Sequence, residues 1–179
     1  SLQQSGGSLV GYITNSTLTG IRLIDVNLGG AASTVGGLVG MVGGDAGHTT
    51  TISTIELNNV TIDGRMYIGG LVGNAPSNGV TNISNITIDT AGISGNSYIG
   101  GLIGYKANTG TMSISEAHIT GANITGAKIN GIDSTRLGGL IGETKAGTTI
   151  MDSSVAGKLS STSPGVEYIG GLVGYLIGA

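Results

Sequence analysis

The chain has 179 residues and a net charge of −3, with 36 glycines and no phenylalanine, tryptophan or cysteine. Glycine in this amount without a Gly-X-Y period excludes collagen, and 39% hydrophobic residues exclude low-complexity disorder. Seven scattered lysines and arginines make no basic patch, so no nucleic-acid partner is expected. The length suits one domain over residues 1–179, with a core of small and branched aliphatic side chains.

One motif, Gly-Gly-Leu followed by Val or Ile and then Gly, recurs along the whole chain. It lies within residues 35–40, 67–73, 98–104, 137–142 and 168–174, after a worn copy at 7–11. The first glycines of the six copies are 29, 33, 31, 38 and 32 residues apart. A period near 32 residues predicts a repeat protein, with units near 7–35, 36–68, 69–99, 100–137, 138–169 and a partial 170–179.

Between the motifs, each unit contains a turn cluster and then strand-like sequence rich in β-branched residues. In chain order, the predicted strand segments are 21–28, 51–64, 80–88, 112–129 and 149–159. Turns precede the last four at 43–47, 74–79, 107–110 and 145–147, and Pro164-Gly165 lies in a later loop. The fourth unit is the longest, and its surplus at 121–134 predicts a bulging loop.

The units favour stacked strands over helices. None has an eleven-residue helical pattern, whereas an apolar residue often follows another by five positions, as in Ile55 and Val60 or Ile114 and Ile119. Thirty-two residues accommodate three short strands and three turns. The sequence therefore predicts a right-handed parallel β-solenoid of five to six three-stranded coils, stacked about 4.8 Å apart. Two 16-residue coils per repeat are the alternative.

Stacking would align equivalent residues of successive units. The motif leucines should form one apolar ladder: Leu38, Leu71, Leu102, Leu140 and Leu172. The first glycines should align beside them: Gly36, Gly69, Gly100, Gly138 and Gly170. Apolar residues flank the double glycine on both alternating faces. Either the glycine pair forms a bulge that resets the alternation, or this sheet is covered on both sides.

The pattern aromatic-Ile-Gly-Gly-Leu-Val-Gly, then a turn, then Ile-x-x-Ser/Asn-x-Val/Ile, closely resembles the GLUG-motif repeat over nearly the whole chain. That repeat occurs in bacterial and archaeal surface proteins, in large adhesin-like proteins and in non-catalytic parts of some IgA-cleaving metalloproteases. The resemblance implies a β-solenoid at an extracellular surface and does not imply an enzyme. The chain departs from the pattern at Ser8, and at Thr34 and Arg136, where other copies have tyrosine.

No motif for catalysis, a cofactor or a metal is found. The chain lacks H-E-x-x-H, G-x-S-x-G and a phosphate loop, and His48 and His118 lie in different units, as expected of solvent-facing histidines. Asp63 and Asp89 occupy comparable unit positions, which indicates strand-end turns rather than an acid–base pair. Gly43-Gly44-Asp45 is a single near-miss of the calcium repeat. The threonine runs 49–51 and 148–149 are not the regular Thr-x-Thr ranks of ice-binding solenoids.

Five Asn-x-Ser/Thr sequons are possible N-glycosylation sites: Asn15, Asn59, Asn82, Asn85 and Asn123. A chain this rich in Ser, Thr and Asn also produces sequons by chance. Asn59, Asn85 and Asn123 are the preferred candidates, because each precedes a β-branched residue and Thr in strand-like sequence.

The expected function is structural, non-enzymatic and extracellular, since charge is sparse and Ser, Thr, Asn and Gly are abundant. Neither end resembles a cap, so the outer sheet edges should pair with something. A subunit stacking head to tail into a filament and a slice of a longer adhesin stalk are the two versions. A carbohydrate-binding or carbohydrate-cleaving solenoid is the alternative, with Tyr12, Tyr105 and Tyr175 as a possible aromatic strip. The uncharged segment 168–179 is too short to span a membrane.

Overall fold

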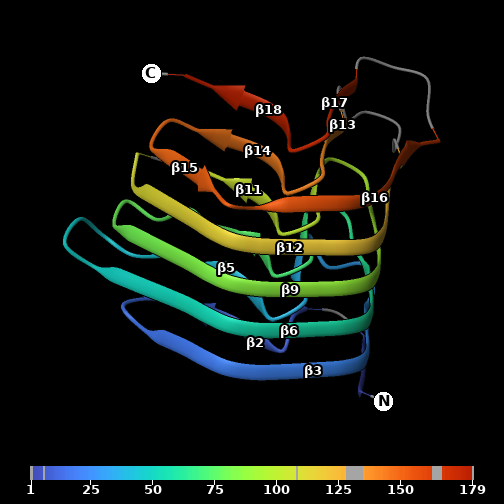
Figure 1. The fold of residues 1–179 in the computed structure, drawn as a ribbon, viewed down its shortest axis with the longest axis horizontal. Helices are drawn as coiled ribbons and strands as arrows, with labels where there is room; N and C mark the ends of the chain where they lie inside the picture. The colour runs from blue at the N-terminus through green and yellow to red at the C-terminus, as the bar shows by residue number, and fades with distance from the viewer. Residues whose placement is uncertain (1, 6, 108, 128–134, 163–166, 179) are drawn as a thin grey trace.

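The computed structural model describes residues 2–5, 7–107, 109–127, 135–162 and 167–178, and in these residues the protein is a parallel β-solenoid without helices. The coils pile along one axis from the N-terminal end to the C-terminal end (Figure 1). Each complete coil contributes a strand to sheet A, then to sheet C, then to sheet B. The predicted three-stranded coil is therefore confirmed, and the alternative of two 16-residue coils is wrong.

Sheet A carries the long strands in the foreground of Figure 1. Its members are β1 (Leu2–Ser5), β3 (Thr17–Gly29), β6 (Thr49–Asp63), β9 (Val80–Gly95), β12 (Thr111–Gly126), β15 (Thr148–Met151) and β16 (Ser154–Ser161). Sheet C consists of β4 (Thr34–Gly36), β7 (Tyr67–Gly69), β10 (Tyr98–Gly100), β13 (Thr135–Gly138) and β17 (Glu167–Gly170). Sheet B consists of β2 (Val10–Ile13), β5 (Val39–Val42), β8 (Val72–Asn74), β11 (Ile103–Lys106), β14 (Ile141–Lys145) and β18 (Val173–Ile177).

The long strands of sheet A bend where the in–out alternation breaks. In β9, Ser84 and Asn85 both face outward between the buried Ile83 and Ile86, and Asp89 with Thr90 repeats this arrangement five residues later. Asn85 and Thr90 have φ of 53° and 54°, in the left-handed region. One left-handed residue thus resets the alternation, and the strand can turn while its apolar residues keep facing the core.

These bends align in register through the stack. The first bend contains Gly20, Thr54, Asn85, Glu116 and Asp152, and the second contains Asp25, Asn59, Thr90 and Gly121, all with positive φ. Gly, Asn and Asp tolerate this conformation best. The predicted five-residue cadence reflects the spacing of the two bends, although Ile55 and Ile114 are not equivalent, because Ile52 is the residue in register with Ile83 and Ile114.

The double glycine forms a corner between two strands. β7 ends at Gly69 and β8 begins at Val72, so the pair is neither a bulge within a strand nor the middle of a covered strand. A Cβ on Gly69 would lie 2.0 Å from the carbonyl oxygen of Val72, and one on Gly70 would lie 2.0 Å from that of Gly101 in the next coil. The first glycine makes the corner possible, and the second lets the next corner stack on it.

The loop predicted at 121–134 is only partly a loop. Gly121 to Gly126 belong to β12 and pair with β9 in register, with Asn123 opposite Gly92. Residues 128–134 lie outside the described residues, as do Pro164 and Gly165.

The two ends of the rod differ. At the N-terminal end, β1 lies parallel beside the second half of β3, with Leu2 opposite Val26. Ser8, which replaces a motif glycine, is buried, and its Oγ accepts a 2.7 Å hydrogen bond from the backbone N–H of Gly36 at the edge of sheet C. Ser8 thus satisfies one backbone group at this end, while β1 is itself the outermost described strand of sheet A. The expectation that neither end is capped therefore stays a prediction.

The corner geometry predicts opposite outcomes for the same change in two coils. Gly70→Ala should lower the free energy of unfolding by about 3 kcal/mol or more, because its Cβ would meet backbone that cannot yield locally. Gly171→Ala is the matched control, since its Cβ would meet nothing within 4 Å. We expect the control to change stability by less than about 0.5 kcal/mol in urea denaturation of dilute protein. Equal losses in both variants would contradict the corner assignment.

The bends predict a second pair of variants. Asn85→Val places a β-branched residue at φ 53° and should destabilise the protein by about 1–2 kcal/mol. Thr87→Val, two residues further along the same exposed face, keeps an extended backbone and should cost less than about 0.5 kcal/mol. Thermal unfolding of both variants checks the difference.

Candidate functional surfaces

A shallow hollow follows the first bend on the outer face of sheet A, over strands β3, β6 and β9. It has a volume of about 490 Å³ and is lined by Gly20, Ile21, Arg22, Thr54, Ile55, Glu56, Asn85 and Thr87. We call this hollow the trough. Gly20 contributes to it by lacking a side chain, because a Cβ there would meet nothing within 4 Å.

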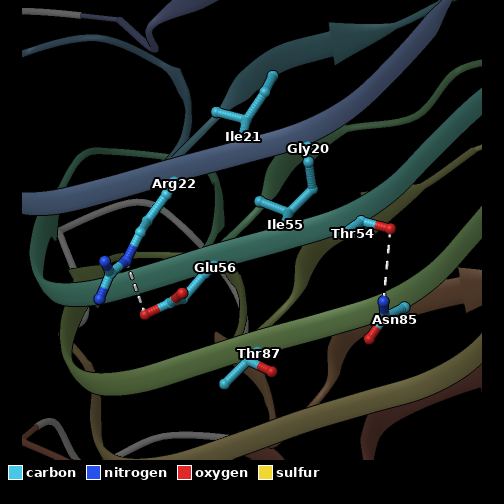
Figure 2. Close-up of a pocket in the computed structure, with 8 residues that line it drawn as sticks. All are labelled: Gly20, Ile21, Arg22, Thr54, Ile55, Glu56, Asn85 and Thr87. Carbon is cyan, nitrogen blue, oxygen red and sulfur yellow. Dashed lines mark hydrogen bonds and ion pairs between the residues drawn. The ribbon is translucent and has the colours of Figure 1, made fainter.

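Two polar bridges flank the trough, one at the bend itself and one two residues further along the strands (Figure 2). On one side, Nε of Arg22 lies 3.0 Å from Oε1 of Glu56, and both side chains are well exposed. On the other side, Nδ2 of Asn85 donates a 3.4 Å hydrogen bond to Oγ1 of Thr54. Both bridges join adjacent coils, so the stacking of the coils positions all four side chains.

A second cluster lies between sheets B and C and contains rings from both. The ring of Tyr105, on β11, stacks on the ring of Tyr67, and its centre lies 4.8 Å from the centre of the Tyr98 ring. Tyr67 and Tyr98 both belong to sheet C. In the next coil, Arg136 pairs with the buried Glu143, and its guanidinium lies 4.8 Å from the centre of the Tyr98 ring. The cluster continues above with Tyr168 and Tyr175, whose ring centres are 4.6 Å apart.

This cluster was missed by the sequence reasoning, although the repeats contain its signal. In the sequence, Arg136 stands out only as a departure from the tyrosine of other copies. Glu143 follows its motif glycine directly, the position that Tyr105 and Tyr175 hold in neighbouring units, and all three pair in register on sheet B. One unit therefore replaces the tyrosine of sheet C by Arg136 and the tyrosine of sheet B by Glu143. Opposite charges at these two positions of the same unit indicate an ion pair between the two sheets.

Burial sets the protonation behaviour of the cluster. Loss of hydration raises the pKa of the Glu143 carboxyl above its ordinary value, although the positive charges of Arg136 and Lys145 act in the opposite direction. Burial likewise raises the pKa values of the Tyr67 and Tyr98 phenols, which keeps them neutral. The nearby Lys106 is 1% exposed and donates a hydrogen bond to the carbonyl of Ala146, and burial lowers its pKa.

The expected tyrosine strip is not continuous. Tyr12, Tyr105 and Tyr175 do share one register position of sheet B, but Met41, Asn74 and Glu143 occupy that position in the coils between them. The ring of Tyr105 packs against two other rings. Its faces are therefore used inside the protein.

The motif leucines lie in register, as their backbone hydrogen bonds show. Leu38, Leu71 and Leu102 donate in turn to the carbonyl of the leucine in the following coil, and Leu140 donates to Leu172. The first glycines Gly36, Gly69, Gly100, Gly138 and Gly170 pair beside them. Leu38, Leu71, Leu102 and Leu140 are fully buried, whereas Leu172 is 47% exposed. The ladder thus ends at an uncovered side chain.

Other side chains of the last coil are exposed in the same way. Ile169 is 50% exposed and Leu176 is 64% exposed, while Leu137, in register with Ile169 one coil below, is fully buried. Met151 and Tyr168 of this coil are also exposed. We call the surface of Ile169, Leu172 and Leu176 the C-terminal end face.

The sequons lie on outward-facing positions. Asn15, Asn59, Asn85 and Asn123 are exposed, and Asn82 is half-buried. Asn15, Asn59 and Asn85 have positive φ. The amide of Asn59 donates a 2.6 Å hydrogen bond to Asp25, which leaves that sequon less accessible than its exposure indicates.

The remaining candidate residues are dispersed. Nδ1 of His48 accepts from the backbone of Asp45, and His118 contacts Ser154. Asp63 accepts a hydrogen bond from the Ser94 hydroxyl, and Asp89 accepts one from the Thr120 hydroxyl. Asp89 lies in register with Asn58, whereas Asp63 lies in register with Ser94. The two aspartates are therefore not at equivalent positions, which corrects the sequence alignment. Among the described residues, no three His, Cys, Asp or Glu side chains form a metal-binding group.

Comparison with protein families, characterised proteins and solved structures finds no match to this chain. Within the described part of the chain, no segment forms a helix that could cross a membrane.

The raised pKa of Glu143 predicts a pH-dependent contribution to stability. A folded-state pKa above the unfolded value of about 4.3 stabilises the protein below that pH, and this contribution is lost as the pH rises through the raised value. The stability of the wild type relative to Glu143→Gln should therefore fall as the pH rises through the mildly acidic range. Urea denaturation at a series of pH values measures this difference. A difference that grows with pH would mean that the Arg136 ion pair outweighs the loss of hydration.

Proposed function

We propose that the protein is a non-enzymatic structural element of the cell exterior, a rod segment that copies of the same chain extend end to end. In a filament of this kind, the C-terminal end face of one copy receives the first coil of the next. The contact is heterologous, so it repeats without closing.

The observation that carries the proposal is the exposure of the C-terminal end face. Ile169 and Leu172 are half exposed, but the residues in register with them in the coil below, Leu137 and Leu140, are fully buried by the coil that follows. One more complete coil, with strands in sheets B and C, would bury both. Exposed, contiguous apolar surface of this type marks an interaction site, and the unpaired edges of β17 and β18 offer backbone hydrogen bonds beside it.

The glycines at the two ends support head-to-tail stacking. A Cβ on Gly139 would lie 2.0 Å from the carbonyl oxygen of Gly171 in the following coil, yet Gly171 has open space. At the other end, a Cβ on Gly40 would lie 2.8 Å from the carbonyl oxygen of Gly11 in the preceding coil, yet Gly11 also has open space. Both positions can accept a neighbouring coil at the spacing used inside the rod.

The remaining parts of the proposal depend on the sequence. Sparse charge, the wealth of Ser, Thr, Asn and Gly, and the resemblance to GLUG repeats support an exterior location. The dispersal of the acidic residues and histidines supports a non-enzymatic role. A longer adhesin stalk would have the same structural role. In that case the next coil would belong to the same polypeptide and not to a second copy.

The two open glycines provide the test. Gly171→Ala and Gly11→Ala should each weaken self-association at least tenfold while leaving the stability of the single chain unchanged, because each Cβ would enter backbone of the neighbouring copy only. Gly92→Ala is the matched control, since it lies mid-rod with its nearest contact at 3.9 Å. Sedimentation velocity over a concentration series and electron microscopy of the same samples measure association.

The outcomes separate three arrangements. Loss of association in both variants supports head-to-tail stacking. Loss in Gly171→Ala alone indicates that two C-terminal end faces meet. A wild-type protein that stays a monodisperse short rod at all concentrations overturns self-assembly.

A further inference from the structure

The trough has the dimensions of a ligand site and is open along the rod. Its volume of about 490 Å³ falls within the range of small-molecule sites. It extends over three successive coils, two steps of about 4.8 Å, or about 10 Å along the axis. Its walls are the Arg22–Glu56 and Thr54–Asn85 bridges, and Thr87 lies at its rim (Figure 2).

The charge of the trough argues against an ionic ligand. Arg22 and Glu56 are the charged residues among those that line it, and they pair with one another at 3.0 Å. An anion would have to compete with Glu56 for Arg22, and a cation would have to compete with Arg22 for Glu56. The trough therefore suits an uncharged ligand.

The sheet itself argues against an extended peptide. A peptide bound to a sheet gains its affinity from backbone hydrogen bonds at an open edge. Here β6 and β9 are each paired on both sides, β6 with β3 and β9, and β9 with β6 and β12. The third strand of the trough, β3, is paired with β6 at residues 21–22, and among the described residues its other edge is open there because β1 pairs only with Val26–Gly29. This open edge faces away from β6, so a ligand lying across β3, β6 and β9 is recognised by side chains.

The floor offers little apolar surface to a purely apolar ligand, because Ile55 is 2% exposed and Ile21 is only partly exposed. What the trough offers is a set of hydrogen-bonding groups fixed by the coil spacing. The ion pair engages Nε of Arg22, and its guanidinium carries further N–H donors on a side chain that is 61% exposed. Glu56 has a second carboxylate oxygen as an acceptor, while Asn85 and Thr87 supply an amide and a hydroxyl.

From these properties we infer that the trough is a binding site for a neutral, hydroxyl-rich ligand, an oligosaccharide lying along the rod axis. Ring hydroxyls would bridge Arg22 and Glu56 on one side, where adjacent donor and acceptor groups match vicinal hydroxyls. Thr87, in register with Glu56, would extend this side, and Asn85 with Thr54 would hold the opposite edge of the sugar. This binding uses β3, β6 and β9 and is independent of the C-terminal end face.

The test is a titration of the ¹⁵N-labelled protein with neutral tetrasaccharides, namely maltotetraose, cellotetraose and mannotetraose. At least one should shift the amide resonances of Gly20, Arg22, Thr54 and Asn85 in a saturable way and leave those of sheets B and C unchanged. Thr87→Trp, which fills the trough from an exposed position, and the double variant Arg22→Ala with Glu56→Ala should each weaken binding at least tenfold. The control is Thr61→Trp. Thr61 is exposed like Thr87 but lies on β6 outside the trough, so this variant should bind as tightly as the wild type.

Two charged probes provide results that could contradict the inference. Inorganic phosphate and a tetrasaccharide of galacturonic acid should cause no comparable shifts. Stronger binding of either would show that the site selects charge, and the assignment of a neutral ligand would then be wrong. An absence of saturable shifts with all three neutral tetrasaccharides also overturns it. Retention of binding by Thr87→Trp would place the sugar elsewhere on the rod.

Discussion

The approach of backbone to backbone at the glycine corners is the constraint on which the rest of the structure depends. At Gly70 and Gly101, a side-chain carbon would lie 2.0–2.1 Å from the carbonyl oxygen of the next coil, so no larger residue fits without a shift of the chain. Each corner is hydrogen-bonded to the corner of the next coil, since the backbone N–H groups of Leu71 and Val72 both donate to the carbonyl of Leu102. This contact fixes the height of every coil, and the height in turn brings Arg22 to Glu56 and Asn85 to Thr54. Coil spacing thus determines the surface chemistry as well as the core.

The fold could be predicted from the sequence because a repeat displays its own constraints. The motif spacing, the absence of a helical period and the β-branched segments together predict stacked three-stranded coils, and the structure confirms that architecture. The glycine corner could not be assigned, because the same residues suit a bulge or a covered strand as well as a corner. The difference lies in which carbonyl each missing side chain would meet, and that contact involves the next coil.

The candidate sites were less predictable, for reasons that particular residues show. Asn85 and Thr54 look like ordinary surface residues in the sequence, yet their left-handed backbone makes the bend that hollows the trough. Glu143 and Arg136 lie on different strands and meet only because both strands turn at the same corner. Asp63 and Asp89 appear equivalent by their distance from the repeat motif, but they are not in register: Asp89 lies opposite Asn58, and Asp63 lies opposite Ser94. Each unit contains two bends, and the distance from the motif alone does not show on which side of a bend a residue lies.

The hydroxyl of Ser8 has a mechanical consequence. It satisfies the amide of Gly36, which belongs to β4, the outermost strand of sheet C at this end among the described residues. In a filament of stacked copies, β1 and β2 would carry sheets A and B across each junction, while the hydroxyl of Ser8 would already occupy this donor of β4. Shear would then separate such a filament at the junctions before it separated coils within one copy.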